Sequence, residues 1–224
     1  MANPTTLTDL LARSLDYADM TSSGFPVAAR NIDYINDGLS ELHEILAMHD
    51  YLRSSASIAL VAGTEEYALP TDFYKSTRVW LLTSGYRYEI ERFNLSQLSG
   101  RKTTGPASSG TAQLWYVPQL AKLSAGADIV SVALPIGWEN FVALHAAIQL
   151  LNREESDPQA LMAERERVKQ RIIGHVEPRD AGGPDQIEDH YNRWGYGTVD
   201  DCSLSMRYRI LGNKIHFVDF GEEA

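Results

Sequence analysis

The spacing of apolar residues changes twice along the chain, and these changes limit the folds that it can adopt. Up to about residue 48, apolar residues recur every three or four positions, as on one face of an amphipathic helix. From about residue 57 to 136 they follow period two and are interrupted by Gly, Pro and Ser, which is typical of short strands and turns. Helical spacing then returns. The pattern predicts an α+β protein, a helical bundle with an inserted β-rich segment.

The helical parts divide into four expected helices, because turn and capping residues interrupt the apolar stripes. The stripe of the second helix includes Ile32, Ile35 and Leu39, and acids lie on its opposite face. Asp157 and Pro158 favour the start of the last helix, as N-cap and first helical residue. The helices are expected at about residues 5–20, 27–48, 139–153 and 158–175.

The insertion at about 57–136 reads as a series of hairpins. SIALVAGTEEYALP predicts two strands around a turn at 63–64, and STRVWLLTSGYRYEIERF predicts a hairpin that turns at Ser84 and Gly85. Asn94 is a candidate cap for a short helix. AQLWYVPQ and DIVSVALP are expected to be the remaining strands.

Residues 177–224 read as an extended C-terminal arm, rich in Gly and acids, that ends in a β-hairpin at 207–218. Gly212 and Asn213 form its two-residue turn. Ile210 then faces Ile215, Tyr208 faces Phe217 on the same side, and Arg209 and His216 share the other face. A two-stranded hairpin alone is marginally stable in water. We therefore expect its apolar face to pack on another chain.

The arm also carries large aromatic residues, which are more typical of a binding segment than of a linker. Together with the apolar face of the hairpin they make up the expected partner-binding residues: Tyr191, Trp194, Tyr196, Tyr208, Ile210, Ile215, Phe217 and Phe220.

The charge of the chain argues against several functions. The net charge is −10, and residues 1–56 carry eight acids against three bases. A nucleic-acid-binding protein usually shows a basic stripe, and none is visible. No apolar run approaches the length of a membrane span, and the N-terminal residues lack the pattern of a signal peptide. Cys202 is the single cysteine, which fits a reducing compartment.

No catalytic or metal-binding pattern stands out. His145 lies in a strongly apolar helix without a Ser or Cys nucleophile nearby, so a histidine satisfied within the core is the better interpretation. His175, Asp180, Asp185 and His190 match no known ligand spacing. The chain contains no phosphate-binding glycine loop. We expect no enzyme activity, no cofactor and no metal.

Several short motifs, in this order, resemble the adaptor (head-to-tail connector) proteins of tailed bacteriophages. They are IDYINDGLSELHEIL, AGTEEYALPTDF, LWYVP, GWENF with AAI and EESD after it, and RDAGGP. The resemblance covers roughly residues 27 to 190, and the residues beyond 191 do not match.

The resemblance implies an adaptor domain at 1–176, with the β-rich segment inserted in it, followed by the arm. It implies a structural part of the virion, a ring typically of about twelve subunits (a dodecamer) between the portal vertex and the tail. The implied partners are the portal protein, neighbouring subunits and a distal tail, nozzle or stopper protein. Double-stranded DNA would pass through the lumen without specific binding, and assembly would take place in the host cytoplasm without a membrane.

Three other classes remain open. A tail-tube or stopper component would share rings and acidity, and would bind tail proteins instead of the portal. A small terminase-like packaging protein would need a basic patch on one helix. A peptidoglycan-cleaving accessory enzyme is a more distant alternative.

Overall fold

The computed structural model describes residues 5–20, 28–83, 86–92, 106, 109–130, 134–176 and 206–219. The chain forms two compact units, each built from two separate stretches of sequence. The described residues within 1–52 and 120–185 form the helical unit, and those within 53–119 and 186–224 form the β unit. The expected division at residue 176 differs from these units, because the C-terminal hairpin belongs to the β unit.

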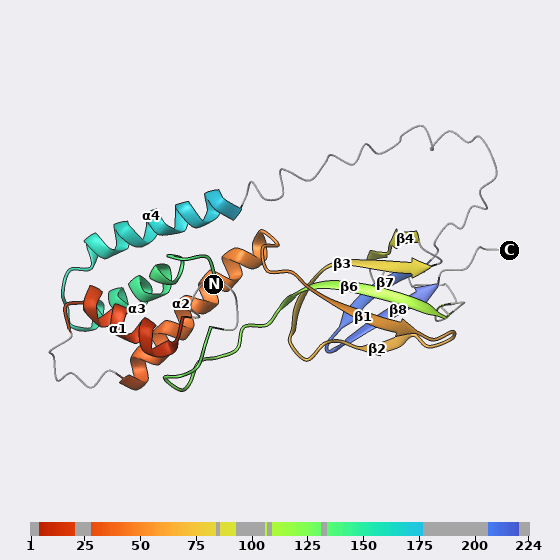
Figure 1. Ribbon diagram of the computed structural model, residues 1–224, viewed down its shortest axis with the longest axis horizontal. Coiled ribbons are helices and arrows are strands. Elements are labelled where there is room, and N and C mark those ends of the chain that lie inside the picture. Colours follow the sequence, from red (N-terminus) through yellow and green to blue (C-terminus); the bar gives the residue numbers. More distant parts are fainter. Residues whose placement is uncertain are drawn as a thin grey trace. The chain divides into compact units, whose positions relative to one another are not determined.

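The helical unit contains the four expected helices, each within three residues of its expected ends (Figure 1): α1 Leu7–Tyr17, α2 Ala28–Met48, α3 Glu139–Arg153 and α4 Gln159–Val176. Helix α1 begins with a capping box. The hydroxyl of Thr6 accepts from the backbone N–H of Asp9 at 3.2 Å, and the Asp9 carboxylate accepts from the backbone N–H of Thr6 at 3.1 Å.

Helix α3 is the centre of the helical unit, since it packs against each of the other three helices. Its sequence is apolar around most of its circumference, with Phe141 and Leu144 fully buried beside small residues such as Ala143 and Ala147. Helix α2 packs closely on α3 at Gly38, where an added Cβ would lie 3.1 Å from the Cβ of His145. A Cβ at this position would therefore require the His145 side chain to shift by a few tenths of an ångström.

Hydrogen bonds from a side-chain amide of α2 hold the loop before α3 against the helices. The Asn36 side chain accepts from the backbone N–H of Leu123 at 2.9 Å and donates to its carbonyl at 3.0 Å. The predicted strand DIVSVALP is wrong in its described part, residues 128–130 and 134–135, where the only pairing is an isolated bridge between Thr6 and Ile129. This loop packs on the helical unit instead of joining a sheet.

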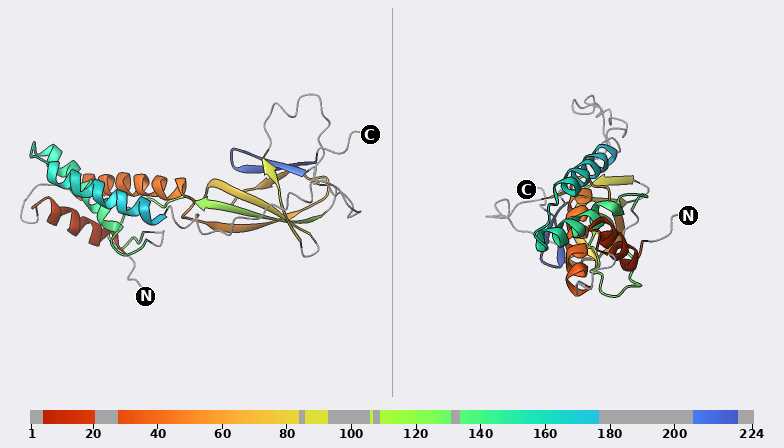
Figure 2. Two further views of the ribbon diagram at one scale, coloured as in Figure 1. Left: turned by 90° about the horizontal axis from the view of Figure 1, so that it is seen from above. Right: turned by 90° about the vertical axis from the view of Figure 1, so that its left-hand side faces the viewer.

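The β unit consists of two four-stranded sheets that face each other (Figures 1 and 2). The first has the order β1-β6-β3-β4, and every neighbouring pair is antiparallel. The second has the order β2-β8-β7-β5. The strands are β1 Ser54–Leu60, β2 Glu66–Ala68, β3 Phe73–Thr83, β4 Tyr86–Glu89, β5 Glu91–Arg92, β6 Gly110–Pro118, β7 Met206–Leu211 and β8 Lys214–Asp219.

One core fills the space between the two sheets. The first sheet contributes alternate apolar residues, which is the pattern expected when one face of a sheet is buried. In β6, for example, Ala112 and Leu114 are buried, while the alternating residues Thr111 and Gln113 are partly exposed. The second sheet contributes Tyr208, Ile215 and Phe217 to the same cluster.

The strands around residue 63 do not pair with each other as the sequence predicts. β1 belongs to the first sheet and β2 to the second, and the segment between them crosses from one sheet to the other. Gly63, with a φ of 77°, and Thr64 lie in this crossing. The pairing of β3 with β4 is confirmed. The expected helix from Asn94 lies outside the described residues.

Candidate functional site

The C-terminal hairpin carries the four expected partner-binding residues that the structure describes. Its register is as predicted, with Tyr208 opposite Phe217 and Ile210 opposite Ile215. The turn residue Gly212 has a φ of 58°, a conformation that favours glycine. The other expected binding residues, Tyr191, Trp194, Tyr196 and Phe220, lie outside the described residues.

The apolar face of the hairpin is covered within its own chain. Ile215 and Phe217 are 0 % exposed and Tyr208 is 5 % exposed. The Phe217 ring meets Tyr67 of β2 edge-on, with a centroid distance of 5.7 Å. The expectation that this face has no partner in its own subunit is therefore wrong. A role for these side chains in binding another protein stays a prediction, and it would require the two sheets to separate.

The hairpin also has strand partners on both sides. β8 pairs with β2 antiparallel, and β7 pairs with β5 parallel. The pairing of Glu66 with His216 joins positions 150 residues apart in sequence. β2 and β5 contain three residues and two residues. The period-two pattern of so short a segment is too weak to identify its partner, so this pairing could not be predicted from the residues alone.

The polar face of the hairpin holds charged side chains near β2. The Glu66 carboxylate accepts from the ammonium of Lys214, and this hydrogen bond is the main reason that the pKa of Glu66 is lowered. His216 Nδ1 lies 3.9 Å from the same carboxylate. One guanidinium nitrogen of Arg209, Nη1, is buried without a hydrogen-bond partner among the described residues.

An open groove of about 520 Å³ lies in the β unit along β4 and β5. Its lining includes Thr77, Arg78, Glu89, Glu91, Arg92 and Tyr208. Basic and acidic side chains alternate around it, and Glu91 also pairs with Arg207 at 3.7 Å. Burial raises the pKa of the Tyr208 phenol. Such a mixed lining offers no concentrated charge for an anion or a cation.

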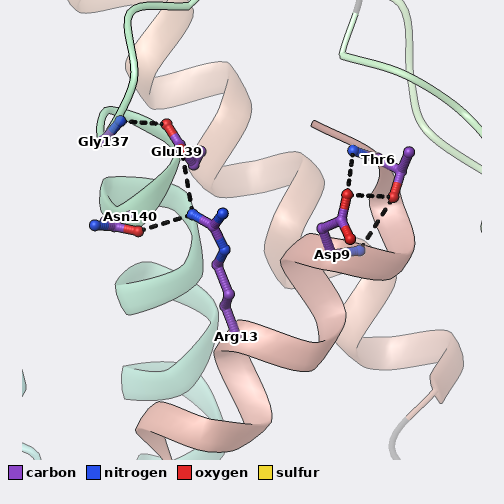
Figure 3. A network of polar contacts seen from close by, with 6 residues as sticks. All are labelled: Thr6, Asp9, Arg13, Gly137, Glu139 and Asn140. Atoms are coloured by element: carbon purple, nitrogen blue, oxygen red, sulfur yellow. Dashed lines mark hydrogen bonds and ion pairs between the residues drawn. The ribbon is translucent and has the colours of Figure 1, made fainter. Parts of the chain in front are cut away.

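In the helical unit, a polar network fastens α1 to the start of α3 (Figure 3). Arg13 donates to the carboxylate of Glu139 and to the side-chain oxygen of Asn140, both at 3.1 Å. The other oxygen of Glu139 accepts from the backbone N–H of Gly137 at 2.7 Å. Since the Glu139 side chain is 10 % exposed, these donors compensate for its loss of water.

A second cluster joins α2, α3 and α4 around Glu41. Its carboxylate pairs with Arg165, and His145 Nδ1 lies 3.6 Å away. The Arg165 guanidinium also stacks over the Phe141 ring at 4.5 Å. Burial, and next the nearby Arg165 charge, lower the pKa of His145. The cluster places His145 in a packed helix interface, in agreement with the interpretation that it is a core histidine.

Neither cluster has the composition of a catalytic or metal site. Within the described ranges, no group of three or more His, Cys, Asp or Glu residues could hold a metal ion. Of the four residues considered above as metal ligands, only His175 is described, and its ring packs edge-on against Trp138 at 5.7 Å. Among the described helices, none is long and apolar enough to span a membrane.

The comparisons with known proteins give the chain its family. No curated protein matches it. The family described as "SU10 adaptor protein" matches residues 5–187, which include all four helices and the first six strands. The order of motifs noted in the sequence agrees with this match. The chain belongs to the SU10 adaptor protein family, a family of phage head-to-tail adaptors.

Proposed function

We propose that this phage adaptor protein forms a ring of about twelve copies between the portal vertex and the tail, and that the ring continues the DNA channel for genome retention and ejection. The observation that carries the proposal is the family match over residues 5–187. The proposed partners are the portal protein, neighbouring copies and a distal tail, nozzle or stopper protein. The role is structural, without catalysis.

The charge of the chain supports a channel that DNA can pass. Each copy carries a net charge of −10, so a ring concentrates negative charge around the duplex. Like charge disfavours contact between the wall and the DNA phosphates. A small terminase-like protein would need the opposite charge on its DNA-binding face, so the charge favours the adaptor over this alternative.

Cryo-electron microscopy of the protein mixed with the portal protein of the same phage tests the proposal. We expect a ring stacked on the portal, with acidic residues facing the channel. Binding to tail proteins but not to the portal would identify a tail-tube or stopper component instead. A lumen lined mainly by Lys and Arg would contradict the argument from charge while leaving the adaptor role intact.

A further inference from the structure

The first sheet of the β unit has two open edges. β1 and β4 are its outermost strands, and within the described ranges no other strand pairs with the outer side of either. An open edge presents unpaired backbone N–H and C=O groups to any strand that approaches. The question is which groups these are and which strand they fit.

One backbone hydrogen bond determines toward which neighbouring strand each residue of this sheet directs its N–H and C=O groups. The backbone N–H of Ile90 donates to the carbonyl of Val79 at 2.9 Å. Val79 therefore bonds toward the β4 side, and because successive residues of a strand bond to opposite sides, Trp80 and Leu82 bond toward β6. Their partners on β6 are Gln113 and Thr111.

The same alternation fixes the free groups of β1. On β6, Ala112 and Leu114 bond toward β1, where their partners are Ile58 and Ala56. The residues between and beside these two must then direct their backbone N–H and C=O groups outward. These residues are Ser55, Ser57 and Ala59, all with exposed side chains.

On the opposite edge, the free groups of β4 follow in the same way. Tyr88, opposite Leu81, bonds toward β3 together with Ile90. Arg87 and Glu89 therefore direct their backbone groups outward, and their side chains are exposed as well. Both edges thus present residues whose side chains lie on the outer face of the sheet.

The two edges are compatible in strand direction and in the face of the sheet on which their side chains lie. Since the sheet has an even number of antiparallel strands, β4 runs opposite to β1. If β4 of one copy lies beside β1 of the next, the two strands are antiparallel, as a continued ladder requires. The residues that bond across the junction have outer-face side chains on both strands, so the buried face also continues without interruption.

The two edges differ in how they are protected against pairing. β4 carries Arg87 and Glu89, charged residues of the kind that discourage edge-to-edge association. β1, with the sequence SSASIAL, has no charge and no proline over seven residues, and its pairing with β6 shows no register shift. An edge without such protection is a template on which a strand of another chain can pair.

We propose that neighbouring copies of the chain join by pairing β1 of one copy with β4 of the next, which extends the first sheet from copy to copy. The proposal rests on the ring proposed above and names the contact within it. The contact is head-to-tail, since two different edges meet, and a head-to-tail contact generates a ring when its rotation closes. Pairing of β1 with β1 would give only a dimer. The short β4 permits few hydrogen bonds, so the contact between one pair of copies is weak. In a closed ring the contact is repeated between all neighbouring copies, and their joint affinity is higher.

Disulfide cross-linking tests the pairing directly. In the two antiparallel registers that place Ser57, the middle of the three outward residues of β1, on the free groups of β4, it lies opposite Glu89 or Arg87. The Cα separation is then about 5.5 Å, within disulfide range. Two variants, Ser57→Cys with Glu89→Cys and Ser57→Cys with Arg87→Cys, are made in a Cys202→Ser background. The matched control combines Ser57→Cys with Ala163→Cys on the exposed side of α4. Each is oxidised alone and after mixing with the portal protein.

We expect one of the two edge variants to form covalent species of three or more copies, while the Ala163 control and the single Ser57→Cys variant do not exceed background. Dimers formed equally by the single variant would indicate β1–β1 pairing and would overturn the proposal. A ring visible by microscopy without cross-links in either edge variant would overturn the strand pairing but not the ring. Absence of any ring for the wild-type protein with its portal would overturn the proposed function and the pairing together.

A proline scan gives a second readout that does not depend on disulfide geometry. Ser57→Pro removes an outward N–H and leaves the bonds of β1 to β6 intact, so we expect loss of the ring with little change in thermal unfolding. Ala56→Pro removes an N–H that bonds to β6, and should lower the unfolding temperature of the β unit. A ring that persists in the Ser57→Pro variant would contradict the pairing.

Discussion

Replacing Phe217 by Ala measures how far the C-terminal hairpin stabilises the β unit. The side chain is 0 % exposed and lies in the cluster shared by both sheets, in edge-on contact with Tyr67. Truncating a buried Phe to Ala leaves a cavity and costs about 3–5 kcal/mol. With a urea m-value of about 2 kcal/mol/M, the unfolding midpoint of the β unit should fall by about 1.5–2.5 M.

Hydrogen exchange followed by mass spectrometry is the appropriate assay, because it reports on each strand separately. In the Phe217→Ala variant, we expect faster exchange in β3 and β6 as well as in the hairpin. Leu211→Ala is the matched control on the same hairpin, since that side chain is 43 % exposed, and its effect should stay below about 0.5 kcal/mol. Phe141→Ala, in the core of the helical unit, should instead increase exchange in α3.

The result that would refute this reasoning is a Phe217→Ala variant as stable as the Leu211→Ala control. The hairpin would then contribute nothing to the core of its own chain. In that case the expectation from the sequence, that its apolar face packs on another protein, would regain its basis. A loss of portal binding in Phe217→Ala, with the exchange of β3 and β6 unchanged, would be the specific sign of such a role.

Three further predictions concern the helical unit and assembly. In a urea titration, Arg13→Ala should lower the free energy of unfolding by about 1–2 kcal/mol, since it leaves the buried carboxylate of Glu139 without its charged donor. Arg167→Ala, at an exposed i,i+3 pair, should lower it by less than about 0.5 kcal/mol. The pKa of Asp9 is lowered chiefly by the hydrogen bond from the Thr6 hydroxyl, so the contribution of Asp9 to stability is present above about pH 4 and is lost as the pH falls through its folded pKa. An NMR titration should show that the pKa of Asp9 rises in Thr6→Ala. An unchanged pKa would contradict this cause. Light scattering of the purified protein should show mainly monomers, because the copies repel at −10 each, and stable dodecamers without portal would contradict this.

The polar contacts that position the helices could not be foreseen from the pattern of residues. The charged Glu139 at the start of α3 reads as an ordinary acidic residue in the first helical turn, yet its partner Arg13 lies 126 residues away. The Thr6 capping box, by contrast, is a local contact, because Thr6 and its partner Asp9 are three residues apart. The aromatic residues of the arm, Tyr191, Trp194 and Tyr196, stay predicted binding residues.

The sequence alone determined the local structure of this protein. Helical stripes, capping residues and the Gly212–Asn213 turn act over a few residues, so α3 has its expected ends and the hairpin its expected register. The order of motifs also pointed to the phage adaptor family, which the match over residues 5–187 confirms.

Only the tertiary structure decided which strands pair beyond the local hairpins β3–β4 and β7–β8. The hairpin forms from local interactions, but its partner β2 is three residues long and about 150 residues earlier in the chain. A strand of that length has almost no pairing preference of its own, and is placed by the apolar area that two whole sheets bury between them. For the same reason the open edge of β1 became visible only with the sheet order, because an edge is defined by the neighbours that a strand lacks and not by its own residues.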